Sequence, residues 1–269
     1  MNPEVLQLLP HLPVWVLVMF RLTGIFIIAP IFGSASIPGR IKILWAFVLS
    51  LCVYPILVSQ PSTLAMIQPV LTGGLSLWTL PAVVALELAI GVVIGYGALI
   101  PLVGIQLAGQ MADQQVGTGL AGIFNPEMGE EAGGIITEFY FIIAMLFFLC
   151  IDGHRAVVAT LLQSFQNIPL GGLMIDGQLI ELIVGLLASM MEVALRIAAP
   201  LLCLVFLETV AMGFLARTVP QMNLLSIGFP LRIVAGVGIL IACMPSHSGI
   251  ISEYLREQLQ TMAGYFGGS

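Results

Sequence analysis

The stretch LPAVVALELAIGVVIGYGALIPLVGIQLA, Leu80–Ala108, decides the fold class, because it is almost entirely apolar and carries only Glu87 as a charged residue. At about 1.5 Å per residue, one helix of this length exceeds the roughly 30 Å hydrocarbon core of a bilayer. Pro101 lies inside it, and a proline bends a helix. Gly91 and Gly95 allow close packing of a neighbouring helix. The stretch predicts a long, kinked helix in a membrane protein.

Similar apolar runs lie on both sides of this stretch, separated by proline, glycine or charged residues. They are about Leu12–Phe32, Ile41–Val58, Ile135–Ile151, Leu179–Leu215 and Ile227–Met244. The run Leu179–Leu215 would be roughly 55 Å long as one helix, so it either kinks at Pro200 or forms a tight hairpin. The predicted fold class is an all-α membrane protein of long kinked helical hairpins, with about six hydrophobic segments. The whole chain, 1–269, is predicted to be one domain.

A polar tail, Ser246–Ser269, follows the last run. Its sequence is compatible with a short amphipathic helix that carries Leu255, Leu259 and Met262 on one side.

The composition excludes several classes of function. Of 269 residues, 59% are hydrophobic and 8% charged, against about 25% charged in soluble domains. The net charge is −6 and the basic residues are scattered, so nucleic-acid binding is not expected. The four cysteines are far apart, and no CxxC, HExxH or P-loop motif occurs, so we expect no metal, no nucleotide and no other cofactor.

The stretch GQMADQQVGTGLAGIFNPEMGEEAGG, Gly109–Gly134, differs from the rest of the chain. It contains seven glycines and four acidic residues, and it has no basic residue. Non-helical backbone beside membrane segments is tolerated where protein buries it or where it lines a wet cavity. We therefore predict a plug-like loop at 109–134, against the alternative of an ordinary loop outside the membrane.

Charged residues inside the apolar runs are costly, so each needs a partner or a function. Glu192 and Arg196 are four residues apart, in the favoured order for a helical ion pair. The other embedded charges have no partner nearby in the sequence, and each should face a neighbouring helix, another subunit or water. These are Arg21, Glu87, Glu138 and Glu208. Proton transfer through the carboxylates is a weaker alternative.

The densest ionisable cluster is Asp152, His154 and Arg155, in the sequence IDGHR. It is interpreted as a turn after the fourth apolar run, with Gly153 at the bend. A catalytic set is the alternative.

Four separated sequences resemble those of the FliR/SctT family of type III secretion export-gate subunits, and they favour the flagellar branch. In order, they are RLTGIFIIAPIFGSASIPGRIKI, GQMADQQVGTGLAGIFNP, IDGHRAVVATLLQSFQNIP and ARTVPQMNLLSIGFPLRI, at 21–43, 109–126, 151–169 and 216–233. The resemblance covers essentially the whole chain.

The resemblance implies a non-enzymatic subunit of the flagellar export channel in the bacterial inner membrane, within the basal body. One such chain would join FliP and FliQ in a helical assembly, with a fold like a fusion of those two partners. FlhB and FlhA would be further partners, and unfolded rod, hook and filament proteins would be the cargo. The embedded charges would then lie at subunit contacts instead of in lipid.

The family's central loop closes the channel from within, which assigns a gate role to the matching residues here. These are Gly109, Gln110, Asp113, Gln114, Gly117, Gly119, Leu120, Gly122, Ile123 and Phe124, of which Leu120, Ile123 and Phe124 would obstruct the channel and Gly117, Gly119 and Gly122 would give flexibility. Residues assigned to subunit packing or turns are Arg21, Pro38, Glu192, Arg196, Arg217, Pro220, Asn223, Gly228 and Pro230.

Two other classes of function compete with this interpretation. A secondary transporter for a small solute shares the broken helices and buried carboxylates. A membrane-embedded enzyme is disfavoured, because no convergent catalytic set is visible.

Overall fold

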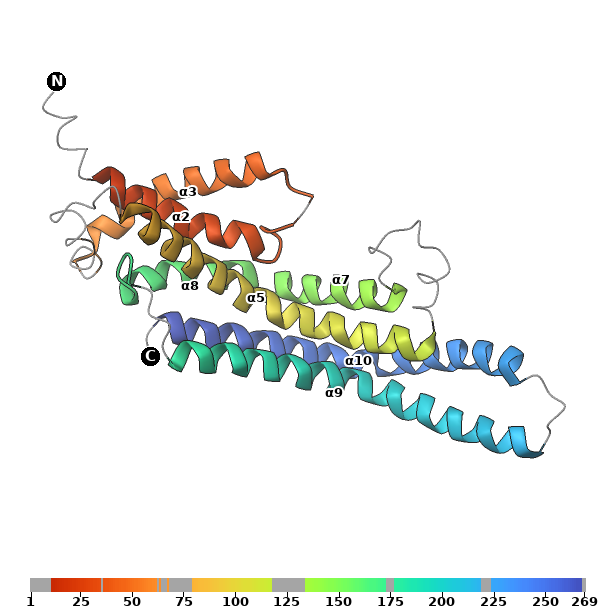
Figure 1. Ribbon diagram of the computed structural model, residues 1–269. Coiled ribbons are helices and arrows are strands. Elements are labelled where there is room, and N and C mark those ends of the chain that lie inside the picture. The colour runs from red at the N-terminus through yellow and green to blue at the C-terminus, as the bar shows by residue number, and fades with distance from the viewer. Residues whose placement is uncertain are drawn as a thin grey trace, which may run out of the picture. The chain divides into compact units, whose positions relative to one another are not determined.

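The computed structural model describes residues 11–34, 36–61, 63, 67, 79–117, 134–172, 177–218 and 224–267. Within these residues the regular secondary structure is entirely helical, which confirms the predicted all-α class. The helices in chain order are α2 (His11–Ile28), α3 (Gly39–Ser59), α5 (Leu80–Val116), α7 (Ile135–Cys150), α8 (Gly153–Asn167), α9 (Gly177–Thr218) and α10 (Leu224–Gly267) (Figure 1).

The helices have the length and composition of membrane spans. In the described part of the chain, five are long and apolar enough to cross a bilayer: α2, α3, α5, α9 and α10. The number rises to six if α7 and α8 are counted as one broken span. The chain is therefore an all-α membrane protein, as the sequence predicts.

The two longest apolar runs are continuous helices. Helix α9 has 42 residues and continues through Pro200, so the alternative of a tight hairpin in Leu179–Leu215 is wrong. Helix α5 has 37 residues and continues through Pro101 to Val116. At about 1.5 Å per residue these helices are about 63 and 55 Å long, well beyond the thickness of a hydrocarbon core.

The polar tail is not a separate short helix. Helix α10 extends from the last apolar run through Pro245 as far as Gly267. The predicted apolar side of the tail is confirmed, because Leu255, Leu259 and Met262 are all buried. Burial of this side explains why the helix continues where the sequence becomes polar.

The chain forms two compact units, each assembled from separated segments. The first unit comprises Met1–Leu99, Asp152–Gly185 and Glu257–Ser269, and the second comprises Ile100–Ile151 and Leu186–Arg256. The chain passes from one unit to the other inside α5, α9 and α10, as well as between α7 and α8. That the chain is one domain stays a prediction.

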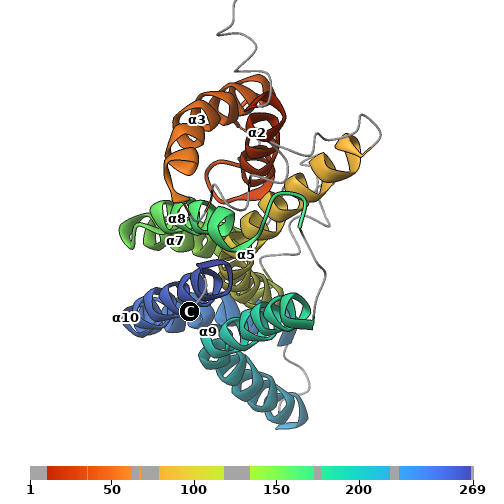
Figure 2. The same cartoon turned by 90° about the vertical axis from the view of Figure 1, so that its left-hand side faces the viewer.

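In the first unit, α2 packs against α3 (Figures 1 and 2). The rings of Trp15 and Phe47 meet edge to face with centroids 5.2 Å apart, an arrangement that aromatic pairs prefer. Where α2 begins and α3 nears its end, a hydrogen bond of 2.6 Å joins His11 Nδ1 and the Tyr54 hydroxyl. The two helices therefore form an antiparallel hairpin.

In the second unit, the end of α5 runs antiparallel to the start of α7, and the two lie side by side (Figure 1). Small residues permit close packing here. A Cβ on Gly104 would lie 2.9 Å from Cγ of Met190 in α9, and one on Gly236 of α10 would lie 2.7 Å from Cγ2 of Val116. Glycines thus let α5 pack closely against both α9 and α10.

Candidate functional site

The predicted gate segment begins inside a helix. Gly109, Gln110, Asp113 and Gln114 all lie on α5, which ends at Val116. This corrects the expectation of a loop from Gly109 onward. The helix persists because its last two turns are amphipathic, with a buried side that includes Gly109, Asp113 and Val116.

Of the other predicted gate residues, the structure describes Gly117. Gly117 follows α5 directly and has a positive φ of 87°. Gly119, Leu120, Gly122, Ile123 and Phe124 lie outside the described residues. Their roles in obstruction and flexibility stay predictions.

Helix α7 lacks a capping side chain of its own. Gly134 occupies its N-cap position and provides no side-chain hydrogen bond. The first N–H groups of a helix have no partner within the helix, and leaving such groups unpaired in apolar surroundings costs free energy.

Asp113 of α5 supplies the missing cap from the neighbouring helix. Its carboxylate accepts hydrogen bonds from the backbone N–H of Thr137 at 2.7 Å and of Ile136 at 3.3 Å, and from the Thr137 hydroxyl at 2.6 Å. Asp113 is only 2% exposed. A carboxylate at the positive end of a helix dipole is favourable, so this buried acid has a clear structural explanation.

Glycine allows the two helices to approach closely enough for this contact. A Cβ added to Gly109 would lie 2.7 Å from Cα of Thr137, and one added to Gly134 would collide with the Asp113 carboxylate. Gly117 ends α5 in the left-handed conformation that glycine adopts readily, and its N–H donates to the Asp113 carbonyl at 2.9 Å. We call Gly109, Asp113, Gly117, Gly134 and Thr137 the α5–α7 clamp.

Two predicted gate residues lie outside the clamp. Gln110 and Gln114 are exposed and stand four residues apart on α5. They share a side of the helix different from that of Gly109 and Asp113.

A buried ion pair lies in the first unit. Arg21 of α2 and Glu87 of α5 are both 0% exposed. They are joined by Nε–Oε2 and Nη2–Oε1 contacts of 2.5 and 3.1 Å. A neighbouring helix, another subunit or water is expected to face each of these charges; the structure shows a neighbouring helix, and each residue is the other's partner.

Further contacts satisfy this pair. Arg21 also donates to Ser164 Oγ at 3.2 Å and lies over the Phe165 ring, 4.3 Å from its centroid. Glu87 accepts from the Gly171 N–H at 2.7 Å. Arg21 is thus an internal packing residue of the first unit, instead of the subunit contact that the resemblance implies.

Two other ion pairs lie in the second unit. Arg196 and Glu192 of α9 are 2.7 Å apart, as their spacing predicts, and their side chains are 60% and 67% exposed. Glu208 of α9 is paired at 2.7 Å with Arg232 of α10. Glu208 therefore also faces a neighbouring helix, which is one of the three surroundings expected for it.

Some of the residues that the sequence assigned to turns lie within helices. Pro38 occupies the N-cap position of α3, and Arg217 lies in the last turn of α9. Gly228 and Pro230 lie within α10, so they do not belong to the turn before it. Pro220 and Asn223 fall outside the described residues.

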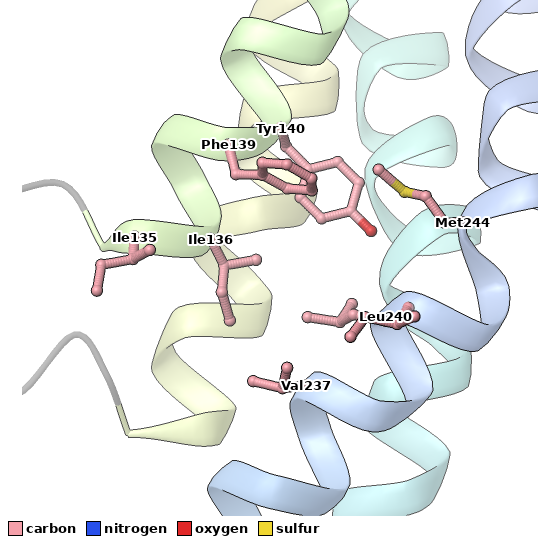
Figure 3. A pocket seen from close by; sticks show the side chains of 8 residues that line it. Ile135, Ile136, Phe139, Tyr140, Val237, Leu240 and Met244 are labelled. Atoms are coloured by element: carbon pink, nitrogen blue, oxygen red, sulfur yellow. The ribbon is translucent and has the colours of Figure 1, made fainter.

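An apolar groove of about 350 Å³ lies between α7 and α10. Figure 3 shows Phe139 and Tyr140 of α7 facing Val237, Leu240 and Met244 of α10. The Tyr140 hydroxyl is hydrogen-bonded to His247 Nδ1 at 2.8 Å. The surface of the groove is apolar, so it offers no convergent set of catalytic groups.

The IDGHR cluster forms a turn, as interpreted. Asp152 has a positive φ of 58° and precedes α8, so the bend falls at Asp152 and not at Gly153. The charged groups of Arg155 and Asp152 are 3.9 Å apart and mostly exposed.

Sequence reasoning missed Thr137, Ser164 and His247. The missing cap of α7 was a usable signal, because the run starting at Ile135 follows glycine and has no Ser, Thr, Asp or Asn directly before it. A helix of this kind needs a cap from elsewhere in the fold. No comparable local signal marks Ser164 or His247.

The comparisons with known proteins cover nearly the whole chain. Residues 12–258 match the family described as bacterial export proteins, family 1. The flagellar biosynthetic protein FliR of Bacillus subtilis is 27% identical over 93% of both chains. The protein of that name from Escherichia coli is 24% identical, over 84% of this chain and 82% of its own. That from Caulobacter vibrioides is 23% identical, over 90% and 93%.

The family match extends from α2 into α10 and includes both the α5–α7 clamp and the buried ion pair. This protein belongs to family 1 of the bacterial export proteins.

Proposed function

We propose that this protein is a non-enzymatic subunit of the flagellar type III protein export gate. The observation that carries the proposal is the full-length similarity to proteins named flagellar biosynthetic protein FliR, together with the family match. The membrane-length helices support a location in the bacterial inner membrane, in the flagellar basal body.

In this proposal the chain forms part of a channel for unfolded rod, hook and filament proteins. It assembles with FliP and FliQ, as one copy among several of each, and it contacts FlhB and FlhA. The length of α5 and α9 supports an assembly that is taller than a bilayer. A solute transporter would place its binding site at interrupted helices. Helices α5 and α9 are continuous, and the charged groups at the break between α7 and α8, those of Asp152 and Arg155, are mostly exposed.

The segment from Gly117 to Gly134 acts as the plug of this channel. The α5–α7 clamp supports this assignment, because it fixes the two helix ends from which the segment leaves and to which it returns. Leu120, Ile123 and Phe124 provide the apolar bulk that obstructs ions and water.

The test is to isolate the complex through a tag on this chain, determine its subunit ratio by mass, and reconstitute it in vesicles. We expect unequal copy numbers with two other hydrophobic proteins, and a low ion conductance. Deleting residues 118–124 should raise the conductance at least tenfold with the subunit ratio unchanged. This deletion starts after Gly117 because Val116 is buried and supports α5.

The control replaces Val103 with alanine, because this exposed residue of α5 lies before the predicted gate residues, and the conductance should stay as it was. A tagged chain that purifies alone, or as a small symmetric oligomer, would contradict the proposed assembly. A deletion variant that assembles and stays impermeable would contradict the plug.

A further inference from the structure

Asp113 makes hydrogen bonds at both ends of the segment that connects α5 to α7. Its backbone carbonyl accepts the N–H of Gly117, which ends α5. Its carboxylate accepts the N–H groups of Ile136 and Thr137, which begin α7. The backbone of residue 113 closes the last turn of α5, which ends at the left-handed Gly117, and the Asp113 carboxylate determines how α7 starts.

The contact leaves little room for adjustment. The hydroxyl and the N–H of Thr137 both donate to the same carboxylate oxygen, Oδ2, at 2.6 and 2.7 Å. Backbone approaches backbone at Gly109, where not even a methyl group fits beside Thr137. Sliding either helix along the other would break these hydrogen bonds and bring atoms into collision.

Opening the contact would be unfavourable in a specific way. It would separate a 2% exposed carboxylate from its donors and leave the first N–H groups of α7 without partners. Buried polar groups that lose their hydrogen bonds carry the full cost of their desolvation. The junction should thus populate a closed arrangement and a fully separated one, with few intermediates.

We propose that Asp113 is the positioning residue of the gate, and that its bonds to the start of α7 set how firmly the export channel is closed at rest. This inference rests on the proposed function. It also changes the role of Asp113, which holds the helix ends instead of obstructing the channel. Thr137, which donates two hydrogen bonds to the Asp113 carboxylate, is its partner in this role.

The experiment uses the assembled complex and two measurements. Hydrogen exchange, followed by mass spectrometry, reports on the amides of Ile136 and Thr137. Ion conductance of reconstituted vesicles reports on the closed channel. The variants are Asp113→Ala, which removes the acceptor, and Thr137→Val, which removes only the hydroxyl. Thr137→Ser restores the hydroxyl, and Val103→Ala is the control at an exposed position of α5 outside the predicted gate residues.

We expect Asp113→Ala to raise the exchange rate at the start of α7 at least tenfold and the conductance several-fold, with the subunit ratio unchanged. Thr137→Val should change both quantities in the same direction by less, whereas Thr137→Ser and Val103→Ala should match the natural protein. If Asp113→Ala prevents assembly, the comparison of Thr137→Val with Thr137→Ser decides the question.

Two results would overturn the inference. One is unchanged exchange in Asp113→Ala and Thr137→Val, because the contact would then not hold the helix end. The other is faster exchange with unchanged conductance in complexes that leak when residues 118–124 are deleted. If the deletion itself causes no leak, the proposed plug fails as well, and the two failures are thereby distinguished.

Discussion

At the scale of single residues, burying the charges of Arg21 and Glu87 costs desolvation free energy, and their mutual attraction and further contacts offset that cost. Desolvating two charges is expensive, and their attraction offsets this only when further hydrogen bonds satisfy the remaining atoms. Here Ser164, Phe165 and Gly171 complete the set. The pair therefore joins α2, α5 and the end of α8 at a single point in the first unit.

We expect Glu87→Ala to destabilise the protein by about 3–5 kcal/mol, because it leaves a buried guanidinium without its counter-charge. The double variant Arg21→Met with Glu87→Leu should recover most of this loss, since it removes both charges and keeps apolar volume. The midpoint of thermal unfolding in detergent measures both effects. A double variant no more stable than Glu87→Ala would show that the surrounding hydrogen bonds matter more than the charges.

The sequence identified these charges as needing partners but did not pair them. Arg21 and Glu87 are 66 positions apart, and only the packing of α2 on α5 brings them together. The i, i+4 pair of Glu192 and Arg196 could be predicted, because helical geometry alone places both groups on one side. Prediction from sequence thus succeeded where the contact is local and stopped where it depends on tertiary structure.

At the scale of elements, the helix cores were predictable from apolar periodicity, but several boundaries were not. The apolar run ends at Ala108, yet α5 continues to Val116 because its buried side packs on α7 and α10. Likewise, α10 continues to Gly267 through a polar tail. Helix α8, Gly153–Asn167, was not predicted as a separate element. In each place tertiary packing outweighs local composition.

The contact of α2 with α5 depends on two glycines. A Cβ on Gly91 would collide with the backbone carbonyl of Arg21, and one on Gly24 would lie 2.8 Å from Cα of Gly91. Because the colliding atoms are backbone, side-chain rotation cannot relieve the overlap. The two helices must therefore separate if either position gains a methyl group.

We predict that Gly91→Ala lowers the stability of the protein by a few kcal/mol, in the range of overpacked cores. Gly185→Ala in α9 is the matched control, because a Cβ there meets nothing within 4 Å. That change should be neutral or stabilising by up to about 1 kcal/mol, since alanine favours a helix interior. Similar unfolding midpoints for the two variants would mean that α2 and α5 are free to separate.

At the scale of the whole molecule, each chain exposes much apolar surface. Only 6% of the most apolar 18-residue segment of α10 is buried. Within this helix, Val234 and Ile241 are 71% and 70% exposed. Lipid could cover such residues, but the exposed pair of Glu192 and Arg196 belongs to the same unit. Charged groups are costly in hydrocarbon, so protein or water should cover at least part of this surface.

We predict that protein, not water, covers the exposed apolar surface of α10 in the assembled gate, because contact with water would leave that apolar surface unburied. A photoreactive benzophenone residue at Val234 or Ile241 should cross-link to other chains of the complex, because apolar surface of this extent is otherwise unpartnered. The same residue at the buried Phe148, where an aromatic ring is already present, is the control, and it should give only products within the chain. The products are separated by mass after irradiation of intact cells. Lipid adducts at Val234 and Ile241, without any cross-linked protein, would show that this face of α10 is turned toward the bilayer.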